Sequence, residues 1–275
     1  MRRNRAPGSG SSCGWVLLGL AWLLAGAPAL GADLEPPPEG LDAHAIAQRA
    51  EDALRGERII LEAKMLIDSS RHSDPREVRF RSFDDRLGER SFIRILSPAK
   101  YEGTAFLKLH PNLWVYEPRD ERTLRIPPSL MREPWMGSDF TYDDLVNDSS
   151  KVDDYDQRLL GIDPKPDGIA DLRAYVVEYV PHEDAPIVWG KIVAWIETEH
   201  GTPLRQEFYD EDGELRRVMH FGGIREVQGR YFPHVWVVRP AGRKGRETRL
   251  EVEAVRFDVD FDESVFDPRH LRSTK

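Results

Sequence analysis

The sequence has little cysteine, no surplus of positive charge and no apolar run long enough to cross a membrane. Its single cysteine, Cys13, lies close to the N-terminus, which excludes a fold held together by disulfides. There are 39 Lys and Arg residues against 48 Asp and Glu residues, and the net charge of −9 argues against a nucleic-acid-binding protein. With 275 residues, of which 40% are hydrophobic and 32% charged, the chain has enough material for a sizeable core. These features indicate an acidic globular protein.

Motifs for catalysis and for metal binding are also missing. The eight histidines are scattered along the chain, and no pair of them has metal-ligand spacing. The sequence contains no glycine-rich phosphate loop and no nucleophile-elbow pattern. We therefore expect no catalytic residue, no metal site, no cofactor and no enzymatic activity.

The one concentration of carboxylates runs from Asp139 to Asp156. A calcium site or an acid–base pair is one interpretation, but the run lacks the interleaved Asp or Asn and the terminal Glu of a calcium loop. The pattern favours a solvated acidic loop with carboxylates that cap a helix. Asp143 and Asp144, placed directly before Leu145, predict the start of a short helix, where negative charge is stabilising.

Residues 1–32 have the pattern of a secretory signal peptide, with basic residues before an apolar run at 15–24 and small residues after it. The run is shorter than the roughly 20 residues that a membrane span needs. We expect cleavage after Ala29 or Ala32, and an uncleaved N-terminal anchor is the alternative. A Pro-rich spacer at 33–40 follows and is expected to be extended and mobile.

The remaining chain, 41–275, is predicted to form one domain. Asp42 as N-cap, apolar residues at helical spacing and Gly56 as C-cap predict one helix. Strands joined by tight turns follow almost throughout, which indicates an antiparallel meander. A phase slip between Ala254 and Val255 predicts a β-bulge in the last strand. The expected strands are residues 58–68, 77–83, 89–96, 104–109, 113–116, 123–126, 152–160, 172–180, 187–198, 203–209, 215–221, 231–239 and 247–259.

Some of these strands are apolar on both faces. In the strand at 187–198, one face is expected to carry Trp189, Val193 and Trp195, and the other Ile192, Ala194 and Ile196. An antiparallel sheet that is dry on both sides must be covered on both sides, yet only one helix is evident. We therefore predict a mainly β, α+β fold in which a strongly curved sheet wraps a helix and an apolar cavity. A packed sandwich or a plugged barrel is the alternative.

The segment from 127 to 142 is irregular but rich in large apolar side chains. Methionines and aromatic rings suit a surface that accepts flexible apolar ligands, whereas a loop that plugs one end of the barrel is the alternative. We predict ligand-cavity or lid residues here and on the aromatic strands, with core packing as the alternative for each. The candidates are Trp114, Tyr116, Trp135, Met136, Phe140, Trp195 and Trp236.

Residues 135–145 resemble the signature of the periplasmic outer-membrane lipoprotein-sorting family, the relatives of the carrier LolA. The motif residues after Trp135-Met136 are Gly137, Ser138, Asp139, Phe140, Thr141, Tyr142, Asp144 and Leu145. Weaker similarities follow in the order of the family at 113–118, 193–196, 203–210 and 266–271, with His270 where Asn is more usual. Together they extend over roughly residues 41 to 271.

The resemblance implies a half-open, strongly curved antiparallel β-barrel with helices as plug or lid over a hydrophobic cavity. It further implies a periplasmic carrier that shields the acyl chains of a lipoprotein or lipid during transfer to the outer membrane. The implied partner is an RND-type inner-membrane exporter, with transient membrane contact and no nucleic acid. An envelope sensor or a transporter-associated binding module on the same fold is the alternative, and an enzyme that uses the acidic segment is another. Shielding an acyl chain makes no bond, which agrees with the missing catalytic motifs.

Overall fold

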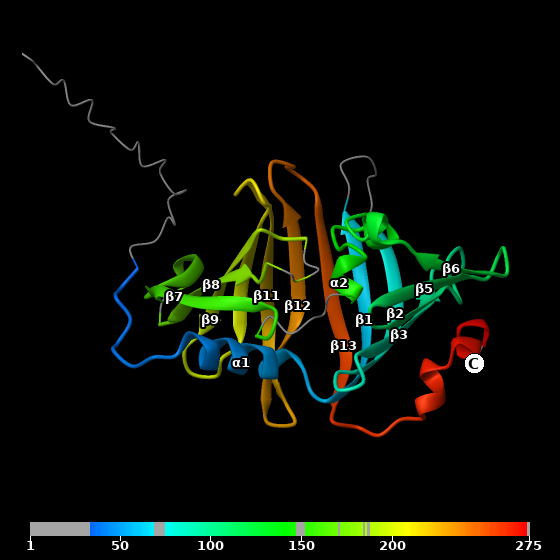
Figure 1. Ribbon diagram of the computed structural model, residues 1–275, viewed down its shortest axis with the longest axis horizontal. Coiled ribbons are helices and arrows are strands. Elements are labelled where there is room, and N and C mark those ends of the chain that lie inside the picture. The colour runs from blue at the N-terminus through cyan, green and yellow to red at the C-terminus, as the bar shows by residue number, and fades with distance from the viewer. Residues whose placement is uncertain are drawn as a thin grey trace, which may run out of the picture. The chain divides into compact units, whose positions relative to one another are not determined.

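The computed structural model describes residues 34–68, 75–146, 152–169, 171–183, 185 and 188–273 (Figure 1). The predicted signal peptide and Cys13 lie outside these residues. Residues 34–275 form one compact unit. None of the helices within the described part of the chain has both the length and the apolar character that a membrane crossing requires.

Thirteen strands and one longer helix make up this unit. The helix α1 (Ala43–Leu54) comes first. The strands of the first half are β1 (Arg58–Asp68), β2 (Arg76–Asp85), β3 (Arg90–Ser97), β4 (Ala105–Leu109), β5 (Asn112–Glu117) and β6 (Arg122–Ile126). The strands of the second half are β7 (Tyr155–Asp163), β8 (Ala174–Pro181), β9 (Lys191–Glu197), β10 (Pro203–Tyr209), β11 (Leu215–Val227), β12 (Arg230–Pro240) and β13 (Glu247–Phe257).

Short helices lie between and after the two groups of strands. Between β6 and β7 are the 3-10 helices η1 (Pro128–Leu130) and η2 (Trp135–Gly137) and the helix α2 (Asp143–Val146), which confirms the predicted helix start at Asp143. After β7 comes η3 (Pro166–Gly168), and the C-terminal segment forms η4 (Glu263–Phe266) and η5 (Pro268–Arg272).

All strands belong to one antiparallel sheet in the order β6-β5-β4-β3-β2-β1-β13-β12-β11-β10-β9-β8-β7. Each half is a meander, and the first and last strands of the chain pair in the middle of the sheet. The segment between β6 and β7 therefore passes from one edge of the sheet to the other. In the described residues these two edge strands do not pair with each other, so the sheet is open, as predicted for a half-open barrel.

The sheet is curved, because one buried apolar cluster draws side chains from all thirteen strands, from Ile126 of β6 to Tyr155 of β7. A flat sheet of this width would hold its two edges too far apart to share a core. Two smaller clusters lie on the other face, one around Phe92 and Leu107 and one around Trp195. The strands that are apolar on both faces therefore belong to a sheet that is covered on both sides, as their sequences predicted.

The two ends of the described chain cover that outer face. Residues of η4 and η5 pack on the cluster of Phe92 and Leu107. At the other end, Glu35 pairs with Ile162 of β7 through two backbone hydrogen bonds of 2.8 and 2.9 Å, and Leu34 packs on the cluster of Trp195. The spacer is anchored at this point, which differs from the mobility expected of a Pro-rich segment.

The helix α1 begins as predicted, since the Asp42 carboxylate accepts a hydrogen bond from the His44 N–H at 3.0 Å. The prediction of Gly56 as its C-cap is wrong, because the cap is Arg55 in an extended conformation. A Cβ on Gly56 would lie 2.6 Å from a carboxylate oxygen of Asp258, the residue after β13, so a larger residue here would require the Asp258 side chain to shift.

Strand positions agree with the alternation of the sequence, with two informative differences. The strand β9 begins at Lys191, later than expected, and β11 continues to Val227. The predicted bulge in β13 is present: Ala254 pairs with Glu62, Val252 pairs with Ala63, and Glu253 is the extra residue.

Candidate functional site

A cavity of about 290 Å³ lies between α1 and the inner face of the curved sheet. This volume is near the lower end of the range of about 300 to 1,000 Å³ typical of small-ligand pockets. Most lining side chains are aliphatic or aromatic. The polar and charged minority comprises Glu51, Arg55, Ser82, Asp84, Ser91, Asp143, Asp144 and Gln206. The aromatic members are Phe80, Trp135, Phe140, Tyr155, Tyr179, Trp189, Phe208, Phe221, Phe232 and Trp236.

The sequence of α1 explains why this space is not filled. The helix lines the cavity with Ala47, Ala50 and Leu54, so two of its three apolar contributions are single methyl groups. Both alanines are nevertheless buried, at 2% and 7% exposure. A helix with long side chains at these positions would pack against the sheet at the density of an ordinary core.

Contacts at both sides of α1 hold it over the sheet, where it touches β7, β8 and β12 (Figure 1). Arg49 donates to the Glu199 carbonyl at 2.7 Å, and Arg230 donates to the Asp52 carbonyl at the same distance. Buried Glu51 pairs with Arg86 of the β2–β3 turn at 3.2 Å. These polar contacts add to the apolar packing of Ile46 and Leu54 in fixing the position of the helix.

The segment between β6 and β7 closes the cavity on another side through a tight turn at residues 135–140. The Trp135 N–H donates to the Phe140 carbonyl at 2.8 Å, and Met136 and Gly137 have positive φ angles of 51° and 70°. Inside the turn, the buried Ser138 hydroxyl donates to the Trp135 carbonyl at 2.7 Å. The turn thus brings the two aromatic residues Trp135 and Phe140 to the cavity wall together.

Two carboxylates of the predicted motif fasten this segment to the sheet. Asp139 pairs with Arg246 at 2.6 Å and accepts from the Thr248 hydroxyl at 2.8 Å, both near the start of β13. Asp144 accepts a hydrogen bond from the Thr141 N–H at 2.7 Å. It also accepts hydrogen bonds from both terminal nitrogens of Arg217 on β11. Asp139 and Asp144 therefore have structural partners. The expectation of a solvated loop is wrong at this point, because the Asp139 side chain is 5% exposed and Asp143 is buried.

Arg217 also sets the ionisation of Asp144. Burial opposes the charged form, but the charge of Arg217 and the hydrogen bonds from Arg217 and Thr141 outweigh it, so the pKa of Asp144 lies below the ordinary 3.8. The guanidinium of Arg217 lies over the rings of Trp189 and Phe208, at 4.6 and 4.3 Å from their centres.

The predicted cavity residues lie in three places. Trp135, Phe140 and Trp236 line the cavity. Met136 packs on the same apolar cluster but is not part of the lining. The other motif residues hold the turn and α2, in which Leu145 lies.

Trp114, Tyr116 and Trp195 lie on the outer face. The first two pack against the cluster that η4 and η5 cover, and Trp195 belongs to the cluster beside Leu34. Their orientation follows from alternation along β5 and β9, because a strand turns successive side chains to opposite faces. An aromatic side chain alone does not tell the inner face from the outer one.

Sequence reasoning missed Trp189, which it placed on the face of Trp195. The structure places Trp189 in the cavity lining, because β9 begins at Lys191 and the alternation does not extend back through Gly190. A Cβ on Gly190 would lie 2.4 Å from the Asp210 carbonyl oxygen, so this glycine permits a close crossing of two chain segments. In the sequence, Gly190 directly after Trp189 was the signal that the strand does not extend back to the tryptophan.

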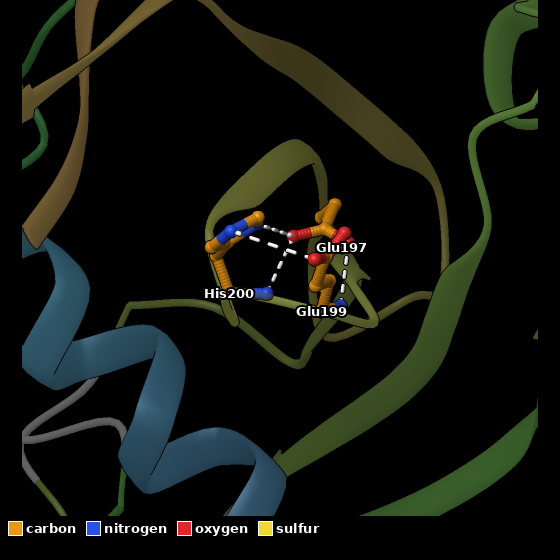
Figure 2. Close-up of side chains that lie close together, drawn as sticks. All are labelled: Glu197, Glu199 and His200. Atoms are coloured by element: carbon orange, nitrogen blue, oxygen red, sulfur yellow. Dashed lines mark hydrogen bonds and ion pairs between the residues drawn. The ribbon is translucent and has the colours of Figure 1, made fainter.

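In the described residues, Glu197, Glu199 and His200 lie close enough together to hold a metal ion (Figure 2). The Glu197 carboxylate is already used, since it accepts the backbone N–H groups of Glu199 at 2.5 Å and of His200 at 2.7 Å. The His200 ring packs against Tyr231, with 3.7 Å between ring centres and an angle of 45° between the ring planes. The cluster closes the turn between β9 and β10.

Comparison with known proteins gives relatives of the same architecture. A domain described as an outer membrane lipoprotein-sorting protein from Vibrio parahaemolyticus is 26% identical, with a TM-score of 0.72 over 84% of this chain and 98% of that one. A DUF1329 family protein from Desulfovibrio piger is 24% identical, with a TM-score of 0.74 over 83% and 97% of the two chains. A LolA superfamily protein from Nitrosomonas europaea is 19% identical, with a TM-score of 0.70 over 84% and 99%.

No curated protein matches the sequence. A protein-family model described as "Uncharacterized protein" matches residues 88–273, more than half of the chain. This match begins before β3 and includes the turn at 135–140 as well as α2. The chain therefore belongs to the family of that model, and its fold is the LolA-like fold of the outer-membrane lipoprotein-sorting proteins.

Proposed function

We propose that the protein is a periplasmic carrier that shields the acyl chains of a lipoprotein or lipid during transfer to the outer membrane. The observation that carries this proposal is the cavity under α1, lined mainly by apolar side chains, in a fold shared with a lipoprotein-sorting domain. The predicted signal peptide at residues 1–32 and a passing encounter with an RND-type inner-membrane exporter belong to the same proposal.

The energetics favour such a cavity. An acyl chain in water costs about 0.8 kcal/mol for each exposed CH₂ group, so a lipid anchor does not cross an aqueous space unaided. The cavity supplies aromatic faces and the flexible side chain of Met219, which adapt to a mobile chain. Carriage requires reversible shielding and no bond-making group.

Trp135 adds a preference for a ligand with a polar head. The side chain is 2% exposed and lines the cavity, and its indole Nε1 has no hydrogen-bond acceptor among the described residues. An unpaired buried donor costs free energy that an acceptor can recover. An ester or amide carbonyl at the head of an acyl chain would supply that acceptor.

The test fills the cavity from the helix side. Ala50→Phe places a ring where a chain would lie, and Ala45→Phe makes the same change at an exposed position of α1. Loss of contact with two CH₂ groups, at about 0.8 kcal/mol each, weakens binding by about tenfold or more. Titration with the fluorescent fatty acid cis-parinaric acid measures this.

We expect tight binding by the parent chain and by Ala45→Phe, and weak binding by Ala50→Phe at an unchanged melting temperature. Mass spectrometry of the gently purified protein is expected to find co-purified lipid in the parent and less of it in Ala50→Phe. Equal binding by both variants, or an absence of binding by the parent chain, would contradict the proposal.

A further inference from the structure

A second, smaller pocket of about 170 Å³ adjoins the cavity and differs from it in chemistry. Its lining includes four arginines and a single carboxylate, that of Asp139. The four arginines are Arg216, Arg217, Arg243 and Arg246. Three of these arginines are paired with carboxylates: Arg216 with Asp210 at 2.6 Å, Arg217 with Asp144 and Arg246 with Asp139. Among the described residues, Arg243 leaves one unpaired positive charge at this pocket, in a chain with a net charge of −9.

The pocket and the cavity share two walls. Phe140 and Trp189 line both of them, so a molecule with an apolar tail in the cavity can extend its head into the pocket past these rings. Arg217 lies at this boundary, buried at 4% exposure against Trp189. Its terminal nitrogens are bonded to Asp144, but its Nε has no acceptor among the described residues.

A β-bulge brings two of the arginines into the pocket together. Phe208 pairs with Arg217 and Tyr209 pairs with Leu215, which leaves Arg216 as the extra residue of β11. Successive residues of a regular strand point to opposite faces, whereas a bulge redirects one of them. Arg216 and Arg217 therefore both line the pocket although they are neighbours in the sequence.

The turn between β12 and β13 supplies the other two arginines. Gly242 and Gly245 have positive φ angles of 71° and 70° and frame the turn. Arg246 pairs with Asp139 at 2.6 Å. Arg243 is exposed and forms no ion pair with any residue that the structure describes, so its charge is available to a ligand.

We propose that this arginine pocket binds the phosphate headgroup of an anionic lipid whose acyl chain occupies the cavity. The inference rests on the proposed function and narrows its cargo to phospholipids, since the acyl anchor of a lipoprotein carries no phosphate. Arginine recognises phosphate through charge-assisted hydrogen bonds, and the buried Arg217 lies at the aromatic boundary between the pocket and the cavity.

The test compares ligands with the same chains and different heads. Dioctanoyl phosphatidic acid, dioctanoylglycerol and glycerol 3-phosphate are titrated by calorimetry at low ionic strength, where exposed charges are least screened. We expect phosphatidic acid to bind about tenfold more tightly than dioctanoylglycerol, the size of a charge-assisted hydrogen bond. Glycerol 3-phosphate, which lacks chains, is expected to bind far more weakly than either lipid.

Arg243→Ser and Lys244→Ser remove the same charge from neighbouring positions of one exposed turn, and only Arg243 lines the pocket. Arg243→Ser is expected to weaken phosphatidic acid binding by about threefold to tenfold and to leave dioctanoylglycerol binding unchanged. Lys244→Ser is expected to change neither.

Equal affinities for the two lipids, or equal effects of the two substitutions, would overturn the headgroup assignment while dioctanoylglycerol binding still supports the carrier. Glycerol 3-phosphate binding as tightly as phosphatidic acid would assign the pocket to free phosphate compounds and also overturn it. If neither lipid binds, the proposed carrier function fails as well.

Discussion

Arg217 and Asp144 face each other across the boundary between the sheet and the segment from β6 to β7. Two hydrogen bonds of 2.7 and 2.5 Å join their side chains, and the arginine is 4% exposed. One partner lies on β11 and the other in α2, so the pair fixes the segment that carries Trp135 and Phe140 to the cavity wall. Buried pairs of this kind are sensitive to loss of one partner, because the remaining charge has no compensation.

Asp144→Asn is expected to lower the free energy of unfolding by about 3 kcal/mol at neutral pH, since it leaves Arg217 buried without a counter-charge. Urea denaturation measures this. The control is Glu247→Gln in the exposed pair of Arg239 and Glu247, 2.9 Å apart, where the change should stay within about 1 kcal/mol. Equal effects of the two substitutions would show that the Asp144 pair does not fix the segment.

The same pair predicts a pH dependence. The folded state holds the pKa of Asp144 below the ordinary 3.8, so ionised Asp144 stabilises the fold above that pH. The stabilisation is lost as the pH falls through the folded pKa. The difference in unfolding free energy between the parent chain and Asp144→Asn should therefore be constant from pH 7 to about pH 5 and decrease below about pH 4. A difference that grows on acidification would contradict this sign.

Much of this architecture follows from the local pattern of the sequence. The strand β1 (Arg58–Asp68) and the strand β10 (Pro203–Tyr209) have the predicted bounds, because alternation and turn residues are local signals. Strands apolar on both faces also predicted a covered, curved sheet. The motif at 135–145 predicted a distinct segment, and its residues form the turn at the cavity wall.

The residues of the site could not be predicted in the same way, because long-range strand pairing brings them together and the local alternation of side chains carries no information about that pairing. Alternation separates Trp195 from Ile196 but does not say which of them faces inward, since closure of the sheet decides that. Trp189 was misplaced because the strand begins after it. The arginine pocket was invisible because it joins a bulge at Arg216 with a turn some 27 residues further on, at Arg243.

Gly190→Ala is expected to destabilise the fold by about 1 to 3 kcal/mol, because its Cβ would overlap backbone atoms of Asp210 and Glu211. Gly222→Ala is the matched control in β11: nothing lies within 4 Å of its Cβ position. At that site the change should be neutral or stabilise by about 0.4 to 1 kcal/mol. Thermal unfolding of both variants tests whether position 190 requires glycine. If Gly190→Ala leaves the stability unchanged, the close crossing at Gly190 does not explain the placement of Trp189.

The two faces of the sheet can be told apart by the fluorescence of single tryptophans. One variant keeps only Trp236 of the seven tryptophans and another keeps only Trp195, with phenylalanine at the remaining positions. Bromine quenches an indole that it touches, so dibrominated stearate should reduce the emission of Trp236, which lines the cavity. Trp195 should keep its emission, because its Nε1 bonds to Asp163 at 3.0 Å on the outer face.

Unbrominated stearate is the control for changes in emission that do not come from contact, and the melting temperatures of the two variants must match before they are compared. Quenching that saturates for Trp236 and stays absent for Trp195 would place the chain between α1 and the inner face. Quenching of Trp195 alone would place it under the terminal segments instead. The cavity beneath Ala47 and Ala50 would then be an unfilled space in the core, with no part in carrying lipid.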